Sequence, residues 1–449
     1  MKKNQISRRR FLSATSTTAV AASGLLARFK PAAAMTGKLA ITGGAPVRTK
    51  KWPIWPNWYA EVENPLLAMF RTGNWFRGSG EHVAEFEKAY AAMMGSRNCL
   101  ATASGTTALM TALHVLGVDA GDEVIVSPYT FIASYNVVFL LKALPVFCDT
   151  DIDTMTMDPK TIAPRLTERT RAILPVHILG LPVDMDPVLE IARRHNLVVV
   201  EDACQAWLAE YKQKKCGTIG DLGCFSFQNS KHLPAGEGGA IIGNNEIMVD
   251  RCHSFHNCGR PFGTSKGDSA YYMRASNFRM QQSQAIILMS QMKRLEKDTQ
   301  IREQNARYLK EKLQHIPGIH PYKLNDGVTR AVFHLFPFRY VQQEFDDIPR
   351  EKFLQALQAE GVPCSSGYGP QYRDGLIEEA LNSRGYQRLF SKSRLKRYRE
   401  ELVLPQNDRL CRESVWFTQN LLLGSQADMD DIVHAIQKIY EQRSELSRS

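Results

Sequence analysis

Short apolar segments alternate with helical patterns through the first two thirds of the chain. They contain few polar residues and lie at 99–102, 124–126, 145–147, 172–176, 197–200 and 224–227. Continuous apolar runs of this length are typical of strands buried on both faces of a parallel sheet. Helical spacing of apolar residues separates them, as in 81–94. The alternation predicts an α/β fold, with a mostly parallel sheet and helices on both faces.

The pattern changes after Pro317. Residues 332–340 have the composition of a strand, 349–360 that of a helix, and 428–444 form a final amphipathic helix. This part of the chain lacks the regular alternation of the first two thirds. We therefore expect a smaller α+β unit there, packed against the larger one.

Length and composition set the domain organisation. A chain of 449 residues with 44% hydrophobic and 23% charged residues suits a globular protein of two folded domains. We expect an N-terminal arm at 35–80, a large domain at 81–319 and a small C-terminal domain at 320–449. No apolar run approaches the ~20 residues that a membrane span needs, so we expect no stable membrane insertion.

Residues 1–34 differ from the rest of the chain. They contain seven lysines and arginines and no acidic residue. The segment 7–12 (SRRRFL) matches the twin-arginine export pattern, a mildly apolar segment follows at 13–26, and Ala32, Ala33 and Ala34 form a candidate cleavage site. A frayed basic tail or a nucleic-acid-binding arm would be the alternatives. The order of these features favours a signal peptide and a periplasmic or extracytoplasmic location.

The basic charge of the chain belongs largely to this segment. Its removal lowers the formal net charge from +10 to +3. We therefore expect no nucleic-acid partner. The nine cysteines are scattered and odd in number, and no Cys/His spacing is that of a zinc site, so we expect no metal. His253 and His256 fit a packing pair better than a pair of ligands.

Two polar residues follow buried strands in a way that suits pyridoxal phosphate chemistry. Asp202 lies just beyond the strand at 197–200, at its carboxyl end. Lys231 follows the strand at 224–227 in a polar turn. Open α/β sheets bind ligands at the carboxyl ends of their strands. A lysine can form a Schiff base with the cofactor, and a carboxylate can keep the pyridine nitrogen protonated. Taken singly, such an Asp is usually a turn or cap residue and such a Lys is usually solvated.

Residues 104–109 (SGTTAL) open a helix after the strand at 99–102. Free N–H groups and the positive end of the helix dipole make such a turn a phosphate site. The same residues also form an ordinary N-cap. Phe131, after the next strand, is either a ring that stacks on a cofactor or part of a helix core.

A set of motifs resembles the core signature of the DegT/StrS family of sugar aminotransferases that depend on pyridoxal phosphate. The motifs are EDACQA at 201–206, GDLGCFSF at 220–227, SKHL at 230–233 and GEGGA at 236–240. The resemblance extends from the arm near Leu39 to the final helix. It implies fold type I of the pyridoxal phosphate enzymes. The segments LAITGGAPVR and FQNSK look most like the branch of scyllo-inosose aminotransferases and aminohydroxybenzoate synthases.

The resemblance implies roles for individual residues. Lys231 would form the Schiff base and then carry the proton between the substrate carbon and the cofactor. Asp202 would pair with the pyridine nitrogen, and Gln205 would hydrogen-bond the phenolic oxygen. Phe131 would stack on the cofactor ring.

The phosphate would be held by residues from two subunits. Gly105, Thr106 and Ser226 match the family positions within one protomer, and Asn277 matches the position that reaches the neighbouring subunit's phosphate. The resemblance therefore implies a homodimer with shared active sites.

The implied reaction is a transamination in two halves. Glutamate or glutamine would donate the amino group, and a keto-sugar or keto-cyclitol would accept it. Two alternatives remain: a sugar dehydratase or lyase dependent on the same cofactor, as in relatives with histidine in place of the lysine, or a non-catalytic cofactor-holding sensory or binding protein. Trp207 and Leu208 depart from the small residues usual in the family, which would reshape the pocket. Export is also unusual for relatives of enzymes that use nucleotide-linked sugars.

Overall fold

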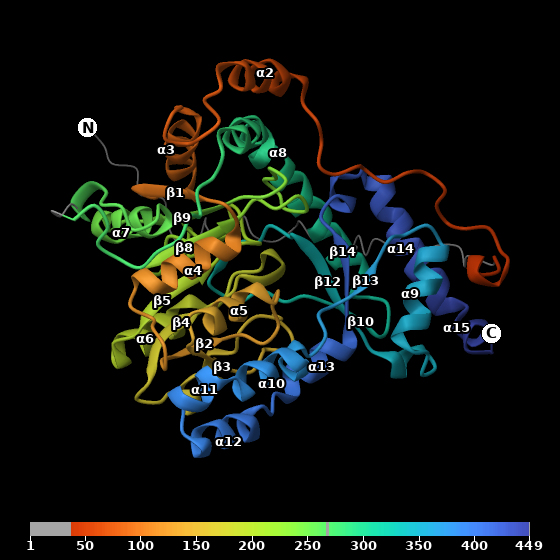
Figure 1. The fold of residues 1–449 in the computed structure, drawn as a ribbon. Helices are drawn as coiled ribbons and strands as arrows, with labels where there is room; N and C mark the ends of the chain where they lie inside the picture. The colour runs from red at the N-terminus through yellow and green to blue at the C-terminus, as the bar shows by residue number, and fades with distance from the viewer. Residues whose placement is uncertain (1–36, 266–268, 449) are drawn as a thin grey trace, which may run out of the picture. The chain divides into compact units, whose positions relative to one another are not determined.

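The computed structural model describes residues 37–265 and 269–448 (Figure 1). From Lys38 onward the described chain forms one compact unit. The expected signal peptide and its cleavage site lie outside the described residues. Within them, no helix combines the length and apolar composition needed to cross a bilayer.

A seven-stranded sheet organises the first half of this unit. From one edge to the other its strands are β1 (Asn98–Thr102), β9 (Gly239–Gly243), β8 (Leu222–Ser226), β5 (Val198–Asp202), β4 (Thr170–Leu174), β2 (Glu123–Val126) and β3 (Leu144–Phe147). The strands from β8 to β3 are parallel, and β9 is antiparallel to both of its neighbours. The predicted mostly parallel, mixed sheet is confirmed. The strand expected at 172–176 ends at Leu174, because Pro175 has no N–H to donate to the ladder.

Helices cover both faces of this sheet, because alternate strand residues point to opposite sides. Leu100, Val126 and Val200 share one core with α4 (Gly105–Val115) and α5 (Ala133–Leu140). On the other face, Ile173 and Val199 pack with α6 (Met185–His195). The β8 and β9 residues of that face pack with α3 (His82–Met94) and with the first part of the long helix α8 (Gln282–Leu313). Helix α7 (Glu246–His256) adds to the first core.

A second, antiparallel sheet lies in the C-terminal part. Its strand order is β10 (Ile319–Pro321), β12 (Leu335–Tyr340), β14 (Ser414–Thr418) and β13 (Ser365–Ser366). Helices α9 (Arg350–Ala359) and α14 (Gln426–Glu441) and the short α15 (Arg443–Arg448) accompany it. A small three-stranded sheet joins β11 (Val328–Arg330), β6 (Glu210–Tyr211) and β7 (Lys214–Lys215). The strand and helices expected after Pro317 are present, and the domain boundary near residue 320 stays a prediction.

Four helices that the hydrophobic pattern did not indicate cover the β3 side of the large sheet (Figure 1): α10 (Gly375–Asn382), α11 (Arg384–Leu389), α12 (Lys392–Glu401) and α13 (Pro405–Glu413). The Tyr386 hydroxyl donates to the carbonyl of Ala143 at 2.6 Å, and the Tyr398 hydroxyl donates to that of Pro145 at 2.8 Å. Part of the expected small domain therefore packs on the large sheet.

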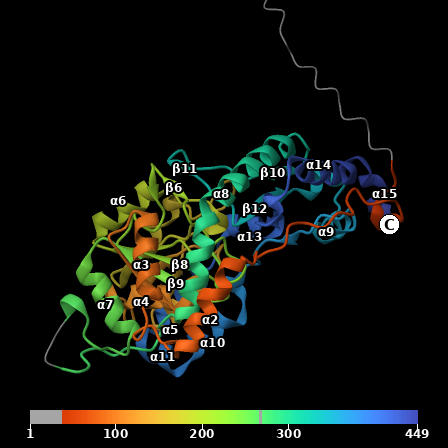
Figure 2. The same cartoon turned by 90° about the horizontal axis from the view of Figure 1, so that it is seen from above.

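The arm between Lys38 and α2 (Glu63–Thr72) runs along the C-terminal helices (Figure 2). Arg48 forms ion pairs with Asp428 and Asp431 at 2.6 and 2.7 Å. The Trp52 indole donates to the Gly361 carbonyl at 2.8 Å. This stretch of the arm is therefore fixed by contacts with its own chain.

The N-terminus of α4 sits unusually close to β8 and β9. A Cβ on Gly105 would lie 2.8 Å from the Cβ of Ser226, and a Cβ on Gly239 would lie 2.3 Å from the Ser104 carbonyl oxygen. Only residues without a side chain permit both approaches. The two glycines therefore set how near the helix end can come to the strand ends.

We predict that Gly239→Ala destabilises the protein by about 1–3 kcal/mol, because the added methyl group meets backbone that cannot shift without moving α4. Chemical denaturation, read as a change in midpoint at constant slope, measures this loss. Gly375→Ala is the matched control, because a Cβ there meets nothing within 4 Å, and we expect it to stay within about 1 kcal/mol of the wild type. Equal stability of the two variants would contradict the prediction.

Candidate functional site

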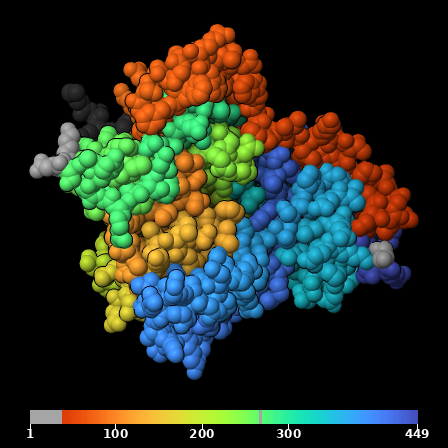
Figure 3. Space-filling view, in the orientation of Figure 1, coloured from red at the N-terminus to blue at the C-terminus, as the bar shows by residue number. Residues whose placement is uncertain are grey.

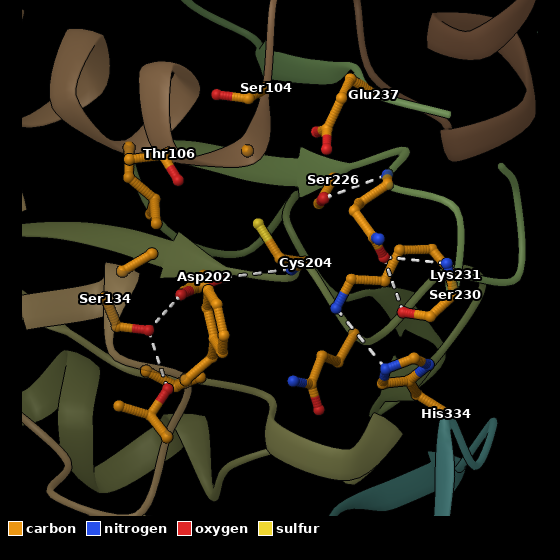
Figure 4. A pocket seen from close by; sticks show the side chains of 18 of the residues that line it. Ser104, Thr106, Ser134, Asp202, Cys204, Ser226, Ser230, Lys231, Glu237 and His334 are labelled. Carbon is orange, nitrogen blue, oxygen red and sulfur yellow. Dashed lines mark hydrogen bonds between the residues drawn. The ribbon is translucent and has the colours of Figure 1, made fainter. Parts of the chain in front are cut away.

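A cavity of about 530 Å³ opens where β5 and β8 end and α4 begins (Figure 4). All the residues predicted for the site line it except Asn277: Gly105, Thr106, Phe131, Asp202, Gln205, Ser226 and Lys231. The structure also places there several polar residues that the sequence analysis did not identify: Thr130, Ser134, Gln228, Ser230, Glu237, His334 and Tyr368.

Asp202 is the last residue of β5 and is 4% exposed. Its two carboxylate oxygens have separate donors: the Ser134 hydroxyl at 2.7 Å and the Cys204 backbone N–H at 3.1 Å. Ser134 lies in α5 and is also hydrogen-bonded to the Thr130 hydroxyl at 2.7 Å. These two donors fix the direction of the Asp202 carboxylate at the edge of the cavity.

Lys231 lies in a turn after β8, and its amine is within the cavity (Figure 4). Its backbone N–H donates to the Gln228 carbonyl at 2.9 Å, and its own carbonyl accepts the Trp55 indole N–H at 3.0 Å. The amine Nζ lies 3.5 Å from Nε2 of His334. Burial lowers the pKa of Lys231, and the thiol of Cys204 and the carboxylate of Asp202 oppose that shift. The amine can therefore lose its proton more readily than a solvated lysine does.

The turn before α4 serves both as a helix N-cap and as a candidate phosphate site. Ser104 is the N-cap and exchanges hydrogen bonds with Thr107 in a capping box. Its side chain satisfies one helix donor, while Gly105 and Thr106 present the first N–H groups of the helix, which have no acceptor within it. The Ser226 side chain lines the same cavity. Backbone donors, a hydroxyl and the helix dipole suit a phosphate group.

Gln205 is fixed at both ends of its amide. The amide oxygen accepts the Leu179 N–H at 2.8 Å, and the amide nitrogen donates to the Tyr368 hydroxyl at 3.1 Å. Burial raises the pKa of Tyr368 to about 12, so this phenol stays protonated. A second amide hydrogen of Gln205 is left to serve an oxygen in the cavity.

Phe131 and Asn277 have different surroundings. Phe131 lines the cavity and is 55% exposed, so it does not belong to the core of a helix. Asn277 is exposed, and its side-chain oxygen accepts the Arg279 N–H at 3.3 Å. It does not line the cavity of its own protomer.

One buried cluster has the composition of a metal site: His177, Glu201 and Cys216. Nδ1 of His177 accepts the Val183 N–H at 3.1 Å, so Nε2 carries the proton and donates to Glu201 at 2.9 Å. The same carboxylate also accepts the N–H groups of residues 217, 219 and 220. Both ring nitrogens and both carboxylate oxygens are therefore occupied, and the cluster acts as a structural brace.

The arrangement fits pyridoxal phosphate. That cofactor has a phosphate, a basic ring nitrogen, a phenolic oxygen and an aldehyde, and the cavity offers a helix N-terminus, an anion, an amide donor and an amine for them. The glycines at 105 and 239 let the start of α4 come close to the ends of β8 and β9, which brings the phosphate donors to the cavity that Lys231 lines. The fit therefore rests on groups present in this chain.

Comparison with known proteins leads to the same chemistry. The sequence profile of the DegT/DnrJ/EryC1/StrS aminotransferase family matches residues 59–417. An L-glutamine:2-deoxy-scyllo-inosose aminotransferase of Streptomyces paromomycinus is 34% identical over 418 residues, covering 90% of this chain and 98% of the relative.

Solved structures agree with the sequence comparison. The crystal structure of 3-amino-5-hydroxybenzoic acid synthase has 27% identity and a TM-score of 0.76, covering 90% of this chain and all of the other. S. venezuelae DesV in complex with a ketimine intermediate has 27% identity and a TM-score of 0.71, covering 85% and 95%. Fold type I is thus confirmed, together with the cofactor. The chain belongs to the DegT/DnrJ/EryC1/StrS family and is an aminotransferase dependent on pyridoxal phosphate.

Proposed function

We propose that the enzyme transfers an amino group from L-glutamine to the ketone of a cyclitol. One observation carries this proposal: the Lys231 amine and the Asp202 carboxylate line one cavity, together with several hydroxyl and amide side chains. The relatives named as L-glutamine:2-deoxy-scyllo-inosose aminotransferases support the choice of donor and acceptor. Glutamate as donor and a keto-sugar as acceptor are the nearest variants of the proposal.

Pyridoxal phosphate, when bound, supplies the electron sink of the reaction. Asp202, held in one direction by the Ser134 hydroxyl and the Cys204 N–H, would pair with the protonated ring nitrogen. Gln205 would donate its second amide hydrogen to the phenolic oxygen. Phe131 would stack on the cofactor ring, and its exposure fits this role, since the cofactor would cover it.

Lys231 would carry the proton between the substrate carbon and the aldehyde carbon of the cofactor, the two carbons that flank the transferred nitrogen. A general base works best when its pKa lies near the working pH. Burial moves the pKa of Lys231 in this direction. The N–H groups of Gly105 and Thr106, with the Ser226 hydroxyl, would hold the phosphate of the cofactor.

The acceptor would meet the remaining polar lining. Ser230, Gln228 and Glu237 lie on the Lys231 side, and Tyr368 approaches from the C-terminal part of the chain. A ring with many hydroxyl groups can exchange hydrogen bonds with each of these side chains. An apolar substrate would form none of these hydrogen bonds. This favours a polyol over an aromatic acceptor.

Dehydration of a sugar is less compatible with this geometry. Relatives with that activity carry histidine at the position of the lysine. Here His232, the nearest candidate, is buried outside the cavity, and its Nε2 lies 3.3 Å from the Phe333 carbonyl oxygen. Lys231 is therefore the group available for proton transfer. A non-catalytic binding protein would have the same cavity. The bleaching experiment below distinguishes that alternative from an enzyme.

We predict that L-glutamine bleaches the absorbance of the protein loaded with pyridoxal phosphate, and that a keto-cyclitol restores it. Lys231→Ala should slow the first half by at least about 10²-fold, because the proton then has no positioned carrier. Lys396→Ala, an exposed lysine on α12, is the control and should behave as the wild type. Absorbance that no amino donor bleaches would support a lyase or a binding protein instead.

We also infer a homodimer with shared sites. Exposed apolar side chains gather on α2 and the residues after it: Leu67, Phe70, Trp75 and Phe76. Figure 3 shows α2 on the molecular surface. The Arg279 guanidinium lies over the Phe76 ring at 5.1 Å, so this surface borders the segment that carries Asn277. A second copy of the chain that covers it would bring Asn277 near the partner's cavity.

Mixed dimers test this inference. Asn277→Ala should weaken cofactor binding about tenfold or more, as expected for loss of a hydrogen bond to a charged group. Coexpressed with Lys231→Ala, it should give about a quarter of the wild-type activity, because half of the dimers are mixed and each has one intact site. Activity no higher than that of the two variants measured separately would show that Asn277 acts within its own subunit.

Residues 1–34 support a further proposal, that the protein is exported folded through the twin-arginine route. Replacing Arg8 and Arg9 together by lysine should keep the full-length protein in the cytoplasm, and Arg28→Lys should leave export unchanged. Cell fractionation with N-terminal sequencing of the mature protein measures both. Cytoplasmic wild-type protein with an intact N-terminus would refute export.

A further inference from the structure

Three aromatic rings pack together directly behind Lys231. Trp207 lies 5.4 Å from His232 and 6.0 Å from His334 between ring centroids, and the two histidines are 5.9 Å apart. All three side chains are buried. Of the three, His334 alone lines the cavity, where its ring faces the Lys231 amine (Figure 4). The cluster therefore connects the wall of the site to one specific atom of the catalytic lysine.

One member of this cluster, Trp207, departs from the family pattern noted above, as does its neighbour Leu208. Trp207 and Leu208 replace small residues, and the Leu208 backbone has φ = 65°, in the left-handed region that favours glycine. Leu208 is nevertheless buried, as is Trp207. Strained backbone persists where the surrounding structure enforces it, and here it places the indole against both imidazoles. Trp207 and Leu208 do not line the cavity themselves. Trp207 instead packs against His334, which does.

The hydrogen-bond partners assign the tautomers of both histidines. A carbonyl oxygen only accepts, so Nε2 of His232, 3.3 Å from the Phe333 carbonyl, carries the proton. A lysine ammonium only donates, so Nε2 of His334 accepts from Nζ, and its own proton sits on Nδ1. The two remaining nitrogens, both Nδ1, are buried without a partner among the described residues.

His334 stays neutral in this position. Burial lowers its pKa well below the usual range, and the positive charges of Lys231 and of Arg302 on α8 lower it further. Arg302 is itself buried, with Nε donating to Gln419 at 2.8 Å and its guanidinium 5.0 Å from the centre of the Trp55 ring. With the charges of Lys231 and Arg302 both disfavouring its protonation, the imidazole of His334 does not compete with Lys231 for a proton.

We propose that His334 is a positioning residue for Lys231: its neutral imidazole accepts a hydrogen bond from the amine and directs it toward the reacting carbon. This rests on the proposed transamination, in which Lys231 carries a proton. While the lysine holds that proton, its ammonium is buried and needs an acceptor. His334 supplies one that is fixed by Trp207 and does not itself titrate. The amine keeps one direction in both of its protonation states.

The first test needs no substrate and no cofactor. In cofactor-free protein, Lys231 is acetylated with acetic anhydride over a range of pH, and the labelled peptide is quantified by mass spectrometry against Lys396 in the same sample. His334→Phe keeps a ring but removes the acceptor, so the ammonium is destabilised. We expect the labelling midpoint of Lys231 to fall by about one to two pH units. His334→Gln, whose amide oxygen can reach the same place, should restore most of the wild-type midpoint.

The second test separates positioning from binding. In loaded enzyme, His334→Phe should lower kcat for the glutamine half-reaction by about 10²-fold, with KM for glutamine changed little, because the amine is misdirected and not removed. His195→Gln, an exposed histidine at the end of α6, is the matched control for both measurements. If His334→Phe does not fold, His334→Leu provides the same comparison.

The outcomes distinguish the role of His334 from the proposed transamination. A wild-type labelling midpoint in His334→Phe would overturn the role of His334, even if activity fell. A shifted midpoint in a protein that glutamine never bleaches would support the contact with Lys231 and refute the proposed function. A fall in kcat that His334→Gln does not rescue, with an unshifted midpoint, would indicate a merely structural role.

Discussion

The parallel pairing of β5 with β8 is the constraint on which the site depends. Its register places Asp202 opposite Cys224, and both strands run toward the same edge of the sheet. The carboxylate at the end of one strand and the lysine in the turn after the other therefore reach one cavity. Strand β9 then returns antiparallel to β8, and Gly239 lets the start of α4 approach the same edge. A register shift of one residue would turn Asp202 to the opposite face of the sheet.

Those parts of the site that depend on local sequence could be predicted. The apolar run before Asp202 marks a buried strand, and its end marks a ligand edge. The turn before α4 carries its own cap and its own free donors, so Gly105 and Thr106 could be identified with no knowledge of tertiary contacts. Lys231 and Ser226 followed from their motifs. The mostly parallel sheet followed from the alternation of short apolar runs with helices.

The remainder depends on contacts between distant parts of the chain. Ser134, His334 and Tyr368 come from α5, from the residue before β12 and from the segment after β13, and nothing in their neighbouring sequence distinguishes them. The helices between residues 375 and 413 carry long polar side chains over a narrow apolar stripe, a weak pattern for prediction. Trp207 was recognised as unusual, but the direction in which it points is decided by packing, which placed it behind the lysine and outside the cavity.

Glu201 and Asp202 show how one strand end serves structure and chemistry together. Successive residues of a strand point to opposite faces, so two adjacent carboxylates have different surroundings. Glu201 holds His177 and the backbone of residues 217–220, just before β8 begins. Asp202 turns to the cavity and has two donors. Glu201 thus fixes the start of β8, the strand that leads to Lys231. Asp202 lines the same cavity as that lysine. Burial lowers the pKa of Lys231 in the same cavity, and the neutral imidazole of His334 lies beside its amine, so the amine can exchange its proton.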